Sequence, residues 1–197
     1  MLRPLTILAA LAAILYGCSD GTTADTAAIP RPRAYPRPVL YAPEYKTVPS
    51  APCRFEVNAS ADATLNVRSD TSAWLDVRYP LYDATLRCTF TQVSDRRSLE
   101  RIVDNRTQRM ALNLGDHPAE QTDVSTPSGV TAIILTAAAP TVTPVQFLAT
   151  FRDWVVSGAL EMPAAACAPA DSLRPVITAV NADLLHAINH LSADDLR

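Results

Sequence analysis

The sequence has little glycine, little histidine and only a small net charge. Each of these features argues against a class of function. Only 5 of the 197 residues are glycine, with no GxGxxG or GxxxxGK[ST] pattern, which excludes the usual glycine loops that cradle phosphate. A net charge of −3 gives no electrostatic reason to expect nucleic acid as a partner. The chain has 3 histidines and neither a GxSxG nor an HExxH motif, so it lacks the patterns of the common hydrolases.

One uncharged, mostly apolar run, Leu5–Tyr16, lies near the N-terminus. It has the length of a signal-peptide core and is too short to cross a bilayer of about 30 Å as a helix. The run ends in Leu15-Tyr16-Gly17-Cys18 and turns polar at once, which resembles a lipobox, where the cysteine thiol receives diacylglycerol. We predict a signal peptide over residues 1–17 and a lipid anchor on Cys18; the alternative is a plain secretory signal with an incidental cysteine.

A proline-rich leader follows over residues 18–50. Its prolines alternate with other residues from Pro30 to Pro38, a pattern that favours an extended polyproline-like segment. Such a segment could be a spacer that holds the folded part away from the membrane. It could equally be a docking segment, because arginines and a tyrosine are interleaved with the prolines. The candidate partner-binding residues are Arg31, Arg33, Tyr35 and Arg37.

Residues 51–197 carry the pattern of one folded domain. Apolar and polar residues alternate along four segments that begin near Cys53, Ala63, Trp74 and Ala84, which predicts half-buried antiparallel strands. The rest of the pattern predicts a helix from Asp95 to Leu114, a hairpin over 122–137, strands over 145–151 and 154–160, and a last helix from Asp171. The segment 145–151 could equally begin a helix. This order predicts an α+β fold, an antiparallel sheet of about six to seven strands covered by two main helices.

Three cysteines remain once Cys18 carries lipid: Cys53, Cys88 and Cys167. Cys53 and Cys88 are on the apolar faces of predicted strands, and a compartment outside the cytoplasm permits oxidation. A Cys53–Cys88 disulfide is therefore the first candidate, although all three pairings stay open because sequence does not give geometry.

Candidate catalytic and metal-binding residues are few. His186 and His190 are four apart on the last helix, on one side with Asp183 and Asp194 and opposite the apolar stripe. Two imidazoles at that spacing could hold a metal ion, but a site needs further ligands and no glutamate follows His186. We interpret these residues as an exposed polar face and expect no metal, no cofactor and no enzymatic activity.

Five arginines make one side of the middle helix basic: Arg96, Arg97, Arg101, Arg106 and Arg109. Such a face is usually solvated, and the alternative is a protein-binding surface.

The ordered set of motifs resembles one family, the gliding-motility lipoprotein GldD of the Bacteroidota. The leader Pro30–Arg37 is similar to its PKPRGYFRI segment, and further similar pieces follow in the same order up to about His190. These pieces are Cys53 with Phe55-Glu56, the stretch from Trp74 to Leu86, Val145-Gln146-Phe147, Ser157–Leu160 and Asp171–Ile177.

The resemblance implies an accessory lipoprotein of gliding motility and of the associated type IX secretion machinery, with no established catalytic action. We therefore expect a cell-envelope protein that faces the periplasm and is anchored by lipid in the inner or outer membrane. Its expected partners are envelope proteins of that machinery. The alternative is an envelope enzyme or a small-ligand-binding lipoprotein with a pocket against the sheet.

Overall fold

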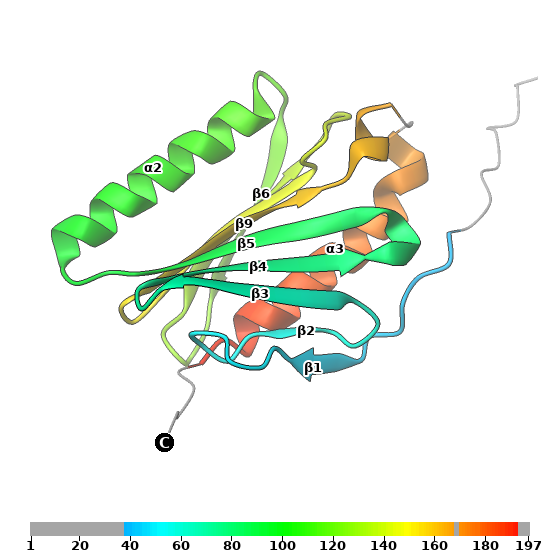
Figure 1. The fold of residues 1–197 in the computed structure, drawn as a ribbon. Coiled ribbons are helices and arrows are strands. Elements are labelled where there is room, and N and C mark those ends of the chain that lie inside the picture. Colours follow the sequence, from blue (N-terminus) through cyan, green and yellow to red (C-terminus); the bar gives the residue numbers. More distant parts are fainter. Residues whose placement is uncertain (1–37, 168–169, 193–197) are drawn as a thin grey trace, which may run out of the picture. The chain divides into compact units, whose positions relative to one another are not determined.

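The computed structural model describes residues 38–167 and 170–192 (Figure 1). Cys18 and the leader residues Arg31, Arg33, Tyr35 and Arg37 lie outside them. Within the described residues the predicted α+β fold is confirmed, with a seven-stranded antiparallel sheet and a two-stranded sheet. The elements are β1 (Tyr45–Thr47), β2 (Glu56–Asn58), β3 (Asp62–Ser69), β4 (Ser72–Tyr79), η1 (Pro80–Tyr82), β5 (Ala84–Gln92), α2 (Arg96–Leu114), β6 (Ala119–Ser125), β7 (Thr131–Ala137), β8 (Val145–Phe151), β9 (Trp154–Glu161), η2 (Pro163–Ala166) and α3 (Ala170–Asn189).

The large sheet consists of two meanders joined at its centre. Its strand order is β3-β4-β5-β9-β8-β7-β6, so β5 and β9 pair although α2 and three strands separate them in sequence. The segment 145–151, for which a helix was the alternative, is the strand β8. Six of its seven residues are buried, because this strand is covered on both faces of the sheet.

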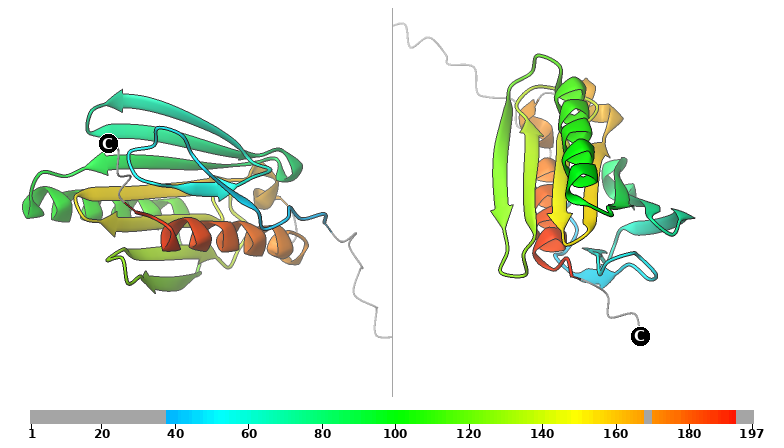
Figure 2. Two further views of the ribbon diagram at one scale, coloured as in Figure 1. Left: turned by 90° about the horizontal axis from the view of Figure 1, so that it is seen from below. Right: turned by 90° about the vertical axis from the view of Figure 1, so that its left-hand side faces the viewer.

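The two helices lie on opposite faces of the sheet (Figure 2). The main core joins α3 to one face, with Val180, Leu184 and Ile188 packed among the inward residues of β4, β5 and β8. A smaller cluster of Val93, Met110, Leu148 and Val155, with partly buried residues of α2 around it, covers the other face near β8 and β9. Alternating strand residues therefore point into two separate apolar layers.

The ends of α2 are where the sequence predicted them. The Asp95 carboxylate caps the helix by accepting a 2.9 Å hydrogen bond from the backbone N–H of Ser98. Gly115, with φ of 59°, ends it, since the left-handed region favours glycine.

The folded part begins earlier than the predicted boundary at residue 51. β1 belongs to the segment interpreted as leader, yet it pairs with β2 in antiparallel register, Tyr45 opposite Asn58. Val48 and Ala51 are buried in the main core. The end of the proline-rich region is therefore a structural part of the domain.

Cys53 and Cys88 are both buried, as the strand pattern predicted. Cys88 is a free thiol, so the candidate Cys53–Cys88 disulfide is not formed in the structure. The two residues belong to different parts of the fold: Cys88 lies on β5 opposite Gly158 of β9, whereas Cys53 precedes β2 outside the large sheet. A shared apolar pattern places both in the main core.

Candidate functional site

One side of α3 carries Asp183 and His186, with His190 directly after the last helical residue, and faces the β1–β2 sheet. The sequence-based interpretation of this side as an exposed polar face is wrong for the first two residues. Asp183 is 8% exposed and the His186 side chain 22%, while His190 is exposed. The reason is β2, which packs along the flank of α3, so a second layer covers the helix outside its apolar stripe.

The inner part of this region is a buried polar cluster around Asp183. Its Oδ1 accepts a 3.3 Å hydrogen bond from the side-chain amide of Asn58, and the hydroxyls of Tyr45 and Tyr79 are in hydrogen-bonding position. Burial raises the pKa of Asp183, although these hydrogen bonds act in the opposite direction. Burial also raises the pKa of Tyr79 well above its ordinary value. The cluster therefore ties α3 to both sheets through groups that lose hydration on folding.

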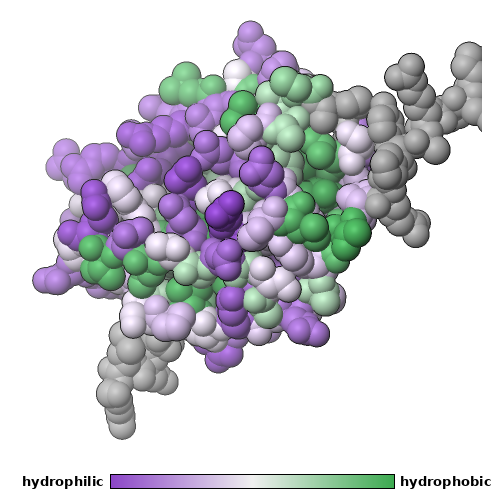
Figure 3. Space-filling model, turned by 45° about the vertical axis from the view of Figure 1, so that its right-hand side comes forward, coloured by the Kyte–Doolittle hydropathy of each residue, from purple (hydrophilic) through white to green (hydrophobic). Residues whose placement is uncertain are grey.

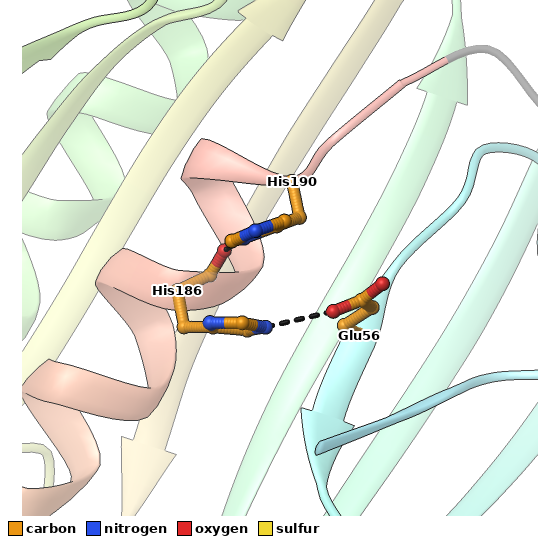
Figure 4. A group of neighbouring side chains, drawn as sticks. All are labelled: Glu56, His186 and His190. Atoms are coloured by element: carbon orange, nitrogen blue, oxygen red, sulfur yellow. Dashed lines mark hydrogen bonds and ion pairs between the residues drawn. The ribbon is translucent and has the colours of Figure 1, made fainter. Parts of the chain in front are cut away.

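The outer part, at the surface, brings together Glu56, His186 and His190 (Figure 4). His186 Nε2 lies 2.7 Å from Glu56 Oε2. The His186 ring stacks between two others, with ring centroids 3.5 Å from Tyr45 and 4.0 Å from His190. Arg54 donates to Glu56 Oε1, at 2.6 Å from Nη2. We call Glu56, His186 and His190 the His–Glu cluster.

The carboxylate of the His–Glu cluster is held in its ionised form. Hydrogen bonding from His186, followed by that from Arg54, lowers the pKa of Glu56 although burial opposes the shift. An ionised carboxylate next to two imidazoles is a set of groups that binds cations.

Sequence reasoning found the histidine pair but missed Glu56, which is 130 residues away from His186. Two signals pointed toward it. Glu56 lies between the buried residues Phe55 and Val57, and the Phe55-Glu56 pair was part of the family resemblance. Neither signal reveals that β2 lies beside α3.

The arginines of α2 form a second charged surface. Arg96, Arg97, Arg101 and Arg109 are exposed and Arg106 is half-buried. Arg96 forms an i,i+4 ion pair with Glu100, whereas no ion pair joins Arg106 or Arg109 to a carboxylate of residues 38–167 and 170–192. Burial, together with the charge of Arg109, lowers the pKa of Arg106. These two arginines line a small hollow of about 190 Å³ over β5 and β9.

A single side chain of β8 fixes the end of α2 above the sheet. The buried Gln146 amide donates to the carbonyl oxygen of Met110 and accepts from the Asn113 side chain, at 3.2 and 3.0 Å. The glutamine of the family-like Val145-Gln146-Phe147 segment thus positions the arginine surface.

Two larger hollows lie against the large sheet. A groove of about 810 Å³ between α2 and β6–β7 has an apolar floor that includes Leu99, Val103 and Leu148 and a rim that includes Arg96 and Asp123. A hollow of about 350 Å³ lies between the first half of α3 and β7, lined by Thr136, Leu173 and Ile177 among others. Neither is lined by His186 or His190, so the candidate chemistry of the His–Glu cluster is separate from both spaces.

Exposed apolar residues gather where the described chain begins. Val39, Leu40 and Leu81 are 71%, 45% and 49% exposed, and the Leu81 N–H donates to the Tyr41 hydroxyl, which holds the two segments together. Figure 3 shows hydrophobic surface beside the first described residues, on a face that is otherwise mixed. In residues 38–167 and 170–192, no helix has the length and apolar character that crossing a membrane requires.

These features define a class, a single α+β domain with one helix on each face of an antiparallel sheet. The family model described as gliding motility lipoprotein GldD matches residues 25–192. Because this match covers most of the chain, the protein belongs to the gliding motility lipoprotein GldD family, and the resemblance is confirmed. It is thus a membrane-anchored lipoprotein of the cell envelope, associated with gliding motility. No individually curated protein matches the chain.

Proposed function

We propose that this protein is a non-catalytic accessory of gliding motility that supports the assembly or stability of the type IX secretion machinery in a member of the Bacteroidota. It acts through contacts with envelope proteins of that machinery. The family match over residues 25–192 carries the proposal.

The proposed anchor is lipid on Cys18, in the inner or the outer membrane, with the folded domain facing the periplasm. Acyl chains contribute about 0.8 kcal/mol per buried methylene, so two or more chains give stable attachment. The segment that contains Arg31, Arg33, Tyr35 and Arg37 then acts as a spacer, as a docking segment, or as both.

The arginine surface of α2 is the proposed contact surface on the domain. Arg106 and Arg109 have no ion pair among the described carboxylates, and Gln146 holds this part of the helix firmly on β8. Guanidinium groups that have no ion pair and are held in place favour a partner with carboxylates, because arginine binds a carboxylate through two parallel hydrogen bonds, in a bidentate geometry. An acidic envelope protein is the partner that this surface fits.

Site-specific photo-crosslinking in the native host tests the contact. A photoreactive side chain at Arg101, on the exposed side of α2, is compared with one at Asp70, in the turn between β3 and β4. We expect an envelope or secretion component to be recovered from the Arg101 position well above the Asp70 control. Equal recovery from both positions, or none, would contradict the proposal.

The apolar groove between α2 and β6–β7 supports a second candidate, a small-ligand-binding lipoprotein. Its volume of about 810 Å³ is in the range of ligand sites. Native mass spectrometry of the protein extracted from its host distinguishes this candidate from the proposed role in protein contacts. A small molecule that the wild type retains and the Leu148→Trp variant loses would favour the small-ligand-binding lipoprotein.

A further inference from the structure

We propose that Glu56, His186 and His190 bind a divalent metal ion of the zinc class, which joins α3 to β2. One ligand atom from each of the three side chains lies within 4.8 Å of the others. The histidines come from one helix and the glutamate from a strand 130 residues away, so only the folded chain presents the set. This inference does not rest on the proposed role in secretion.

The outer contacts of Glu56 and His190 use atoms other than the ones that would bind the metal. Both bonds from Arg54, from Nε at 3.0 Å and Nη2 at 2.6 Å, go to Glu56 Oε1, and Oε2 faces His186. His190 Nδ1 lies 2.9 Å from the His186 carbonyl oxygen. Because a carbonyl oxygen only accepts, Nδ1 carries the proton and Nε2 of a neutral ring keeps its lone pair. Ligand carboxylates and imidazoles in metal sites are commonly held by outer partners of these kinds.

The change that binding requires is local. Zinc bonds to nitrogen and oxygen are about 2.0–2.2 Å, so ligand atoms around a tetrahedral ion lie roughly 3.3 Å apart. The 2.7 Å contact between His186 Nε2 and Glu56 Oε2 must open slightly, and the exposed His190 ring must turn out of its stack toward the other two atoms. Metal binding to imidazole needs the lone pair. The proton on His186 Nε2 therefore leaves to solvent as the metal–nitrogen bond forms, and Nδ1 keeps or takes up one proton, so that the ring stays neutral.

The donor types select the metal. Two imidazoles and one carboxylate suit Zn²⁺ and neighbouring transition metals, whereas Mg²⁺ and Ca²⁺ prefer oxygen ligands throughout. Three protein ligands leave a fourth tetrahedral position for water. The Glu56 carboxylate gives the site a negative charge beside the Arg54 guanidinium, and the Glu56 and His186 side chains are only 12% and 22% exposed, so solvent competes little for the ligands.

Titration of the full-length chain with Zn²⁺ alone tests the site. The protein is purified in mild detergent without a polyhistidine tag, and Cys167→Ser is included in every arm because Cys167 is the exposed thiol of the described residues. We expect one Zn²⁺ per chain by calorimetry and a melting temperature that rises with Zn²⁺ concentration. Glu56→Gln and His190→Ala should each weaken binding about tenfold or more, because loss of an outer partner alone costs about 10–100-fold.

The matched control is His117→Ala, which removes an exposed histidine outside the cluster and should bind Zn²⁺ as the wild type does. His190 is exposed, so its removal leaves the fold intact, which far-UV circular dichroism checks. The proposal is overturned if the wild type binds no stoichiometric Zn²⁺, or if binding survives unchanged in both Glu56→Gln and His190→Ala.

Discussion

Burial determines the chemistry of the cysteines at the scale of single residues. Cys88 is 2% exposed, and loss of hydration, followed by the charge of Asp76, raises the pKa of its thiol far above the ordinary value. The thiolate is the reactive form. Cys167, in contrast, is exposed after η2, so the two thiols differ in accessibility.

Thiol labelling is expected to separate these residues. In the native protein an alkylating reagent should modify Cys167 and leave Cys88 unmodified, as read by peptide mass mapping. After unfolding without a reductant, Cys88 should become labelled, because its thiol is free in the structure. Labelling of Cys88 that appears only after reduction would show a disulfide instead.

Asp183 gives a pH dependence with a definite sign. Burial raises its pKa in the folded state, so its ionisation works against folding as the pH rises above the ordinary aspartate value of about 4. The Asp183→Asn side chain has a similar shape and no charge. The free energy of unfolding of this variant, relative to that of the wild type, should therefore increase as the pH rises above about 4, measured by denaturant unfolding. Asp70→Asn, at an exposed turn, is the control, and an equal gain there would contradict the interpretation.

Close backbone packing at the centre of the sheet depends on one glycine of β9. A Cβ atom at Gly158 would lie 2.6 Å from the Arg87 carbonyl oxygen and 2.6 Å from Cε1 of Phe147. Neither the Arg87 carbonyl nor the Phe147 ring can move away easily, because Arg87 belongs to the paired strand β5 and Phe147 is fully buried.

Gly158→Ala is therefore expected to lower the free energy of unfolding by about 1–3 kcal/mol, the usual cost of overpacking. Thermal melting by circular dichroism measures the loss. Ser125→Ala on the exposed edge strand β6 adds no atom and should change the melting temperature little. A Gly158→Ala protein as stable as the wild type would show that β5 and β9 are not held as closely as described.

Periodicity predicted the inner strands of the large sheet because strands such as β4, β5 and β8 bury one or both faces. Runs such as Leu75-Val77-Tyr79 carry that pattern directly, and Asp95 and Gly115 mark the ends of α2 through local backbone chemistry. β1 was missed because three residues in a proline-rich context have no readable period. The pattern near Cys53 predicted a strand but not its place beside α3, so the flank of α3 looked solvent-exposed and the contact of Glu56 with His186 was hidden.

At the scale of the whole molecule, attachment to the membrane depends on the proposed lipid at Cys18. A Cys18→Ser variant should lose acylation and lipoprotein processing, which shifts its mobility on a gel and changes how it partitions in detergent phase separation. The wild type in the same host is the reference. A variant that is processed as before and stays wholly with membranes would contradict a lipid anchor at this residue.

The proposed function as a whole is tested most directly by deleting the gene in the native host and measuring the proteins that it secretes. We predict a reduced secreted-protein profile and reduced levels of envelope components of the secretion machinery, both restored by the wild-type gene. Secretion and envelope-protein levels that stay unchanged in the deletion strain would contradict the role in the type IX machinery.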